Sequence, residues 1–250
     1  MAEADLARCQ WPPLTAKYAE ALREAVAFVL VEFRPSGIVA AGSILRGEGD
    51  LRSDLDLFVI HSAPFKQRLQ RRFAGVPVEM FVNPPRSVRE YFASENERAR
   101  PSTAHMMATG FVVLDAPDLG ELRAEAAEWL RKRSPPTADQ ALGDRYRVAT
   151  VLEDAEDVSE RDPSMAIQLL GESVSEALRH WLRVRNGVLP GAKHLLAQVR
   201  QGDAELGAAC DRFFAAADGT ERVRLARQIV QTCVGVVEFF EWDSPRIPVA

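Results

Sequence analysis

Residues 42–60 read GSILRGEGDLRSDLDLFVI, and the strand at their end decides the fold. The run DLDLFVI, residues 54–60, is rich in strand-forming residues, yet it contains Asp54 and Asp56. Side chains two residues apart on a strand point to the same face, so the two carboxylates lie close together. Buried carboxylates repel each other unless a cation lies between them or one of them takes a proton.

The turn before this strand predicts an anion-binding element. A short apolar run, residues 36–42, ends in Gly42-Ser43 and predicts a strand that turns directly into a short helix. Such a turn presents backbone N–H groups and a hydroxyl to an anion. Mg²⁺ binds one or two carboxylates together with substrate phosphates, so it is the expected partner of Asp54 and Asp56.

Glu79 interrupts another apolar run, VPVEMFV, residues 76–82. If this strand lies beside the strand at 54–60, Glu79 faces the aspartate pair and completes a cluster able to hold two metal ions. Two ions suit in-line displacement at phosphorus, because one activates the attacking oxygen and the other stabilises the leaving pyrophosphate. The alternative is an exposed glutamate on a half-buried edge strand.

In the rest of the first half, the spacing of apolar residues predicts a small sheet with helices. Helical spacing runs from residue 14 to 34 and stops at Pro35. Residues 64–75, PFKQRLQRRFAG, predict a basic helical connector, whose arginines either are solvated or bind a nucleotide; they are Arg68, Arg71 and Arg72. The other expected elements are helices at 86–99, 102–109 and 118–133, and a strand at 111–116.

The second half predicts helices alone. The segment SPPTAD, residues 134–139, is the best linker signal in the chain, and Thr137 is the expected helix N-cap. It divides the chain into an α/β domain, residues 1–134, and a helical bundle domain, residues 135–250. The expected helices span residues 138–160, 163–186, 192–200, 203–217 and 219–241.

Composition narrows the class of protein. The chain has 250 residues, 47% of them hydrophobic, and a net charge of −5, which disfavours broad binding to nucleic acid. Neither a disulfide framework nor a zinc site is expected, because the three cysteines lack a CxxC spacing and the four histidines lack ligand spacing. No segment has the roughly 18 apolar residues of a membrane span. We therefore expect a soluble, cytoplasmic protein without nucleic-acid or membrane partners.

The motif resembles that of a known superfamily. Gly42-Ser43, then nine residues, then Ser53-Asp54-Leu55-Asp56, followed by a strand with Glu79, is similar to the signature of the DNA polymerase β-type nucleotidyltransferases. Size and a helical second half resemble the stand-alone bacterial members, including the aminoglycoside, lincosamide and minimal nucleotidyltransferases. The resemblance covers residues 14 to about 115 by motif and the rest by architecture, and it implies an α+β fold with a small mixed sheet followed by a helical bundle.

The resemblance also implies roles for individual residues. Asp54, Asp56 and Glu79 would be the catalytic carboxylates and metal ligands. The phosphates of the nucleotide would contact the turn and its neighbours, which are Gly42, Ser43, Arg46 and Ser53.

Two further candidates come from the helical half. Lys193 follows a Pro-Gly turn and is the candidate for binding the nucleotide phosphates, with ordinary surface exposure as the alternative. Glu172 would bind a cationic acceptor or serve as general base, and a helix-surface carboxylate is the equal alternative.

His105, in the first half of the chain, lies in a loop-to-helix segment, where a structural role is favoured over one in the cleft.

The implied activity is Mg²⁺-dependent transfer of a nucleoside monophosphate to an acceptor hydroxyl. AMP from ATP is the favoured donor group, and another nucleoside triphosphate is the alternative. A small cationic acceptor such as an aminoglycoside fits a carboxylate-rich cleft between the domains. The alternatives are an antitoxin-like protein adenylyltransferase and a non-catalytic nucleotide-binding interaction protein. The expected assembly is a monomer or homodimer.

Overall fold

A computed structural model describes residues 6–50, 53–244 and 246. The chain divides into two compact units, Met1–Lys132 and Arg133–Ala250, and each is described by itself. In the described residues the first unit combines a five-stranded mixed sheet with helices, whereas the second is helical. The α+β class predicted from the sequence is therefore confirmed.

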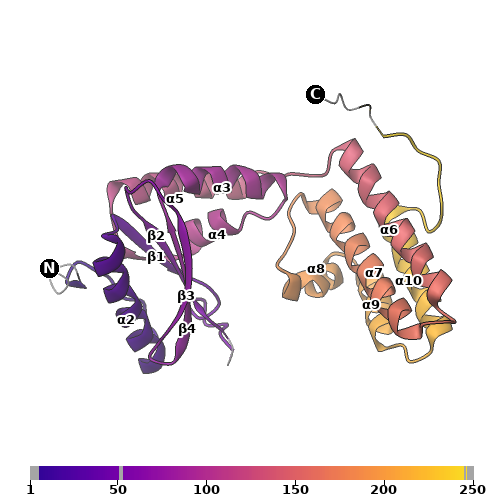
Figure 1. The fold of residues 1–250 in the computed structure, drawn as a ribbon, viewed down its shortest axis with the longest axis horizontal. Helices are drawn as coiled ribbons and strands as arrows, with labels where there is room; N and C mark the ends of the chain where they lie inside the picture. Colours follow the sequence, from indigo (N-terminus) through magenta and orange to yellow (C-terminus); the bar gives the residue numbers. More distant parts are fainter. Residues whose placement is uncertain (1–5, 51–52, 245, 247–250) are drawn as a thin grey trace. The chain divides into compact units, whose positions relative to one another are not determined.

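Five strands form one sheet in the order β3-β4-β2-β1-β5 (Figure 1). β2 lies antiparallel to β1 and parallel to β4, while β3 and β5 are antiparallel edge strands. The parallel pair matters most for the site, because it sets Asp56 directly opposite Glu79. The strand bounds are β1 Gly37–Ala41, β2 Leu55–Ile60, β3 Gln67–Phe73, β4 Val76–Asn83 and β5 Phe111–Leu114.

Helix α2, Ala16–Phe33, covers one face of the sheet (Figure 1). Its apolar residues recur at helical spacing, so Leu22 and Val26 are buried on the same side of the helix. They belong to one core with Leu57 of β2 and Met80 of β4. Because strand side chains alternate, the residues next to Leu57 and Met80 lie on the other face. Asp56 and Glu79 are therefore on the face opposite α2.

Three helices pack on this second face, namely α3 Pro85–Glu97, α4 Ser102–Thr109 and α5 Pro117–Arg131. Val39, Phe58 and Ile60 meet their apolar sides in a separate core. Phe58 is two residues from Asp56, so the carboxylates and this core share one side of the sheet.

The helical connector expected at residues 64–75 is wrong, because this segment contains strand β3. All of Gln67–Phe73 pairs antiparallel with β4. Ala74 and Gly75 join the two strands with positive φ angles of 44° and 76°, which suits a tight hairpin turn. Leu69, Arg71 and Phe73 lie toward α2, whereas Arg68 and Gln70 contact Glu79 on the other face. The side chains therefore alternate with the period of a strand. Intervening arginines and glutamines concealed that period.

The short helix expected after Ser43 is a series of turns instead. Backbone N–H groups of Arg46 and Glu48 donate to Ser43 O at 3.2 and 2.9 Å, and Gly47 N donates to Ile44 O at 3.2 Å. Gly47 has a φ of 74°, and glycines here disfavour a regular helix. The middle of the motif, residues 51–52, lies outside the described residues.

The second unit is a set of packed helices, and none of the helices in the described part of the chain has the length and apolarity to cross a membrane. Helix α10 stops at Val234 rather than at 241, because Gly235 takes a left-handed φ of 76° and caps it. Helix α8 begins at Leu195, after a short 3₁₀ turn η1. The helix bounds are α6 Ala138–Val158, α7 Pro163–Asn186, η1 Ala192–His194, α8 Leu195–Gly202, α9 Ala204–Ala215 and α10 Gly219–Val234.

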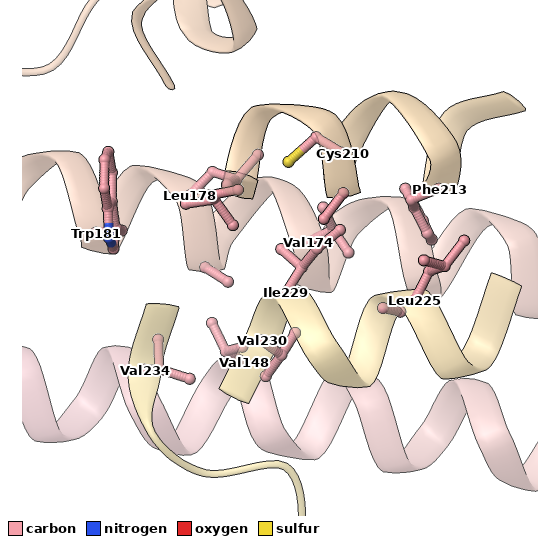
Figure 2. Close-up of a cluster of buried hydrophobic side chains, with 14 of the residues drawn as sticks. Val148, Val174, Leu178, Trp181, Cys210, Phe213, Leu225, Ile229, Val230 and Val234 are labelled. Carbon is pink, nitrogen blue, oxygen red and sulfur yellow. The ribbon is translucent and has the colours of Figure 1, made fainter. Parts of the chain in front are cut away.

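The core of the second unit joins residues from α6, α7, α9 and α10. Val148, Val174, Leu178 and Ile229 are buried together (Figure 2). Cys210 lies in the same core, and burial raises the pKa of its thiol to about 11. A thiol that stays protonated is a poor nucleophile, so Cys210 is a packing residue.

Gly110, between α4 and β5, provides a test of the packing on the second face. A methyl group there would lie 2.4 Å from Val39 Cγ1 and 2.5 Å from Met106 O. We expect Gly110→Ala to lower the free energy of unfolding by about 1–3 kcal/mol or more, because well-packed atoms must shift. Urea-induced unfolding measures the change.

Gly120, inside α5, is the matched control, because a methyl group there has no neighbour within 4 Å. Gly120→Ala should raise the free energy of unfolding by about 0.5–1 kcal/mol, since alanine is the better helix former. Equal effects of the two substitutions would contradict the described packing.

Candidate active site

Asp54, Asp56 and Glu79 come together at one end of the parallel strand pair. Asp56 and Glu79 are paired positions of β2 and β4, and Asp54 immediately precedes β2. One carboxylate oxygen from each residue lies within 4.8 Å of the others. Glu79 is buried, whereas the two aspartates are half-buried. Three hard oxygen ligands at this spacing fit a Mg²⁺ site.

The pKa of Asp56 shows that the closely spaced carboxylates repel one another. Burial, followed by the nearby negative charges of Asp54 and Glu79, raises the pKa of Asp56 from 3.8 to about 6. The positive charges of Arg68 and Arg46 act in the opposite direction and are weaker. A bound cation would favour the charged form, so the carboxylates and a metal stabilise each other.

Arg68 is the counter-ion of Glu79. Its Nε donates to Glu79 Oε1, and Gln70 Nε2 donates to the same oxygen at 3.2 Å. The hydrogen bond raises the pKa of the Arg68 guanidinium, which also lies 5.0 Å over the Phe81 ring. Both donors contact Oε1 of Glu79. A helical interpretation of this segment missed the contact, because it did not pair residue 68 with β4.

Gly42 is required by its close approach to Asp56. Its φ is 98°, and a Cβ added there would lie 2.9 Å from Asp56 Oδ2. Any other residue would be strained and would press on the carboxylate. The glycine thus lets the end of β1 lie against the acidic cluster.

The two serines of the motif contact each other. Ser43 Oγ donates to Ser53 Oγ at 3.1 Å. Ser53 Oγ also accepts from Asp50 N at 2.8 Å and donates to Asp50 Oδ1 at 3.2 Å. These bonds bring both hydroxyls, ten positions apart in the chain, to the turn that precedes the aspartates.

Arg46 and His105 lie near the same turn. Arg46 is exposed, and its Nε donates to Glu48 Oε2 at 2.9 Å. Partial burial, followed by the charge of Arg46, lowers the pKa of His105. Arg46 is thus close enough to affect the pKa values of both His105 and Asp56, and its contact with a nucleotide phosphate stays a prediction.

Lys193 and Glu172 belong to the second unit. Lys193 is exposed in η1, and Glu172 is exposed on α7. Both are accessible side chains, and their participation in the site stays a prediction.

A pocket of about 380 Å³ opens at the carboxylates. Asp54 and Glu79 line it together with Gln70, Arg71, Arg72, Pro77 and Val78. The cluster therefore faces solvent-accessible space, as a metal and substrate require.

The fold is similar to that of a solved protein described as a "nucleotidyltransferase-like protein from Exiguobacterium sibiricum 255-15". The two share 14% sequence identity with a TM-score of 0.51, and the alignment covers 86% of this chain and 73% of that chain. This similarity shows a nucleotidyltransferase-like fold. No protein-family model matches the sequence, and the search of curated proteins found no match.

The raised pKa of Asp56 makes stability depend on pH. A carboxylate whose pKa rises from 3.8 to about 6 on folding contributes stability below about pH 4 that is lost as the pH rises through 6. Without divalent cations, Asp56→Asn should raise the free energy of unfolding by roughly 2 kcal/mol at about pH 7.5, and this gain should vanish near pH 4. Denaturant unfolding in a chelator across this range measures it.

The control is Glu20→Gln, which neutralises an exposed carboxylate on α2. We expect this variant to change little with pH. A gain in Asp56→Asn that is the same at every pH would contradict the electrostatic explanation.

Proposed function

We propose that the chain is a Mg²⁺-dependent nucleotidyltransferase that transfers AMP from ATP to a hydroxyl of a small molecule. The convergence of Asp54, Asp56 and Glu79 beside the Gly42 turn carries the proposal. The nucleotidyltransferase-like fold is consistent with it. The cluster is not explained by a role in stabilising the fold. Its three carboxylates repel one another and raise the pKa of Asp56, so they destabilise the fold unless a cation binds.

In this proposal two groups of residues have separate tasks. The carboxylates of Asp54, Asp56 and Glu79 would hold the metal. A bound metal ion would supply positive charge for the attacking oxygen and for the leaving pyrophosphate. Ser43 and Ser53 offer hydroxyl donors to the triphosphate, as the backbone at Gly42 comes close to it.

The transfer is a displacement at the α-phosphorus. The acceptor oxygen forms a bond to this phosphorus while the bond from the phosphorus to the α,β-bridging oxygen breaks, and pyrophosphate leaves with that electron pair. The hydroxyl proton goes to a carboxylate, and Glu79 is the candidate in the first unit. Gln70 and Arg68 orient Glu79 through Oε1 for this task.

Removal of the two aspartates tests the proposal. Calorimetric titration with Mg²⁺ and a non-hydrolysable ATP analogue should show binding to the native chain. The Asp54→Asn, Asp56→Asn double variant should bind at least about tenfold more weakly, because two charged ligands are lost. Glu20→Gln is the matched control and should bind normally.

Unchanged binding by the double variant would overturn the assignment. A second experiment uses ATP labelled at its α-phosphate to identify the class of acceptor. Label on a small molecule would agree with the proposal. Label on a co-purifying protein would favour the protein adenylyltransferase instead.

A further inference from the structure

A larger pocket, of about 740 Å³, lies in the first unit on the same face as the carboxylates. Its floor includes Phe58 and Phe81, which are two residues after Asp56 and Glu79 on their strands. Arg68 lines this pocket and also bonds Glu79, so one side chain belongs to both places. The pocket therefore adjoins the acidic cluster at Arg68.

The charge of this pocket is opposite to that of the cluster. Lys66, Arg68 and Arg100 line it, against the single carboxylate of Glu95. Both oxygens of Glu95 are already hydrogen-bonded, by Thr103 N at 2.7 Å and Thr103 Oγ1 at 2.8 Å. Three cations with one bonded carboxylate give a positive lining.

Two of these cations are available to a ligand. Among the described residues no carboxylate forms an ion pair with Lys66 or Arg100. Lys66 Nζ instead lies 5.1 Å over the ring of Tyr91, which holds the side chain at the pocket wall. Clustered cations without partners repel one another, and an anion relieves that repulsion.

The floor offers a second kind of contact. The rings of Phe58 and Phe81 are stacked with centroids 5.9 Å apart. They form an apolar surface beside the cations, which suits the carbon skeleton of a ligand. Buried Asn83 and partly exposed Tyr91 add polar groups around this surface.

We propose that the acceptor is a small hydroxylated molecule that carries a phosphate group. Lys66 and Arg100 bind its phosphate, and its hydroxyl extends past Arg68 toward Glu79. Lysine and arginine bind phosphate oxygens through short charge-assisted hydrogen bonds. The assignment rests on the proposed function and replaces the cationic acceptor expected from the resemblance, since a polycation would meet repulsion here.

Ribose 5-phosphate and inorganic phosphate are the probes, and ribose and an aminoglycoside are the neutral and cationic controls. Titrations of the full chain are made with Mg²⁺ and the non-hydrolysable ATP analogue present. Both phosphate probes should bind, and neither control should. Arg100→Ala and Lys66→Ala should each weaken ribose 5-phosphate binding about tenfold or more, because each removes a charge-assisted bond.

Arg86→Ala is the matched variant, because it removes a positive charge from exposed α3 outside the pocket, where Arg86 pairs with Glu90 at 3.0 Å. Arg86→Ala should leave the binding of ribose 5-phosphate and of the ATP analogue unchanged. Arg100→Ala should also leave binding of the ATP analogue unchanged, since we place Arg100 at the acceptor.

Four results would overturn the inference. Nucleotide binding without ribose 5-phosphate binding would overturn the acceptor assignment alone. Equal weakening by Arg86→Ala would show general ionic attraction, and equal weakening of ATP-analogue binding by Arg100→Ala would assign the pocket to the nucleotide. Absence of nucleotide binding would overturn the proposed function itself, and the acceptor assignment with it.

Discussion

Repulsion among three carboxylates is the constraint on which the first unit depends. The parallel pairing of β2 with β4 holds Asp56 opposite Glu79, and backbone hydrogen bonds keep them there despite the repulsion. The raised pKa of Asp56 is the sign of that cost. Features around the cluster follow from it, because Gly42 leaves room for the Asp56 carboxylate and Arg68 supplies a counter-charge to Glu79.

The sheet tolerates this cluster because its two faces have different tasks. Leu57 and Met80 alternate with the acidic residues and bury their side chains against α2. The apolar contacts on that face stabilise strands whose other face carries charge. Under the proposed function a bound cation would offset this local repulsion, and such instability is common where binding and stability compete.

The second face separates negative from positive charge along the strands. The carboxylates lie near the start of β2, and farther along the same face Lys66, Arg68 and Arg100 line the larger pocket. Arg68 lies at the boundary between the two. Under the function and acceptor that we propose, a metal-bound nucleotide would occupy the acidic part and a phosphate-bearing acceptor the basic part, so one face would bring two anionic substrates together without their direct repulsion.

The sequence by itself predicted strands at 36–42, 54–60 and 76–82, and the structure has them at Gly37–Ala41, Leu55–Ile60 and Val76–Asn83. Short apolar runs between turn residues favour this conformation. The sequence also determined which carboxylates interrupt them, and the Gly42-Ser43 turn that precedes them. Only the tertiary structure decided that residues 67–73 form an edge strand, because pairing with β4 overrode a pattern that looked helical. That pairing placed Arg68 on Glu79, and the fold of α3 and α4 brought Arg100 to the same pocket. Contacts between residues far apart in the chain depend on strand order and helix packing, which local spacing does not encode.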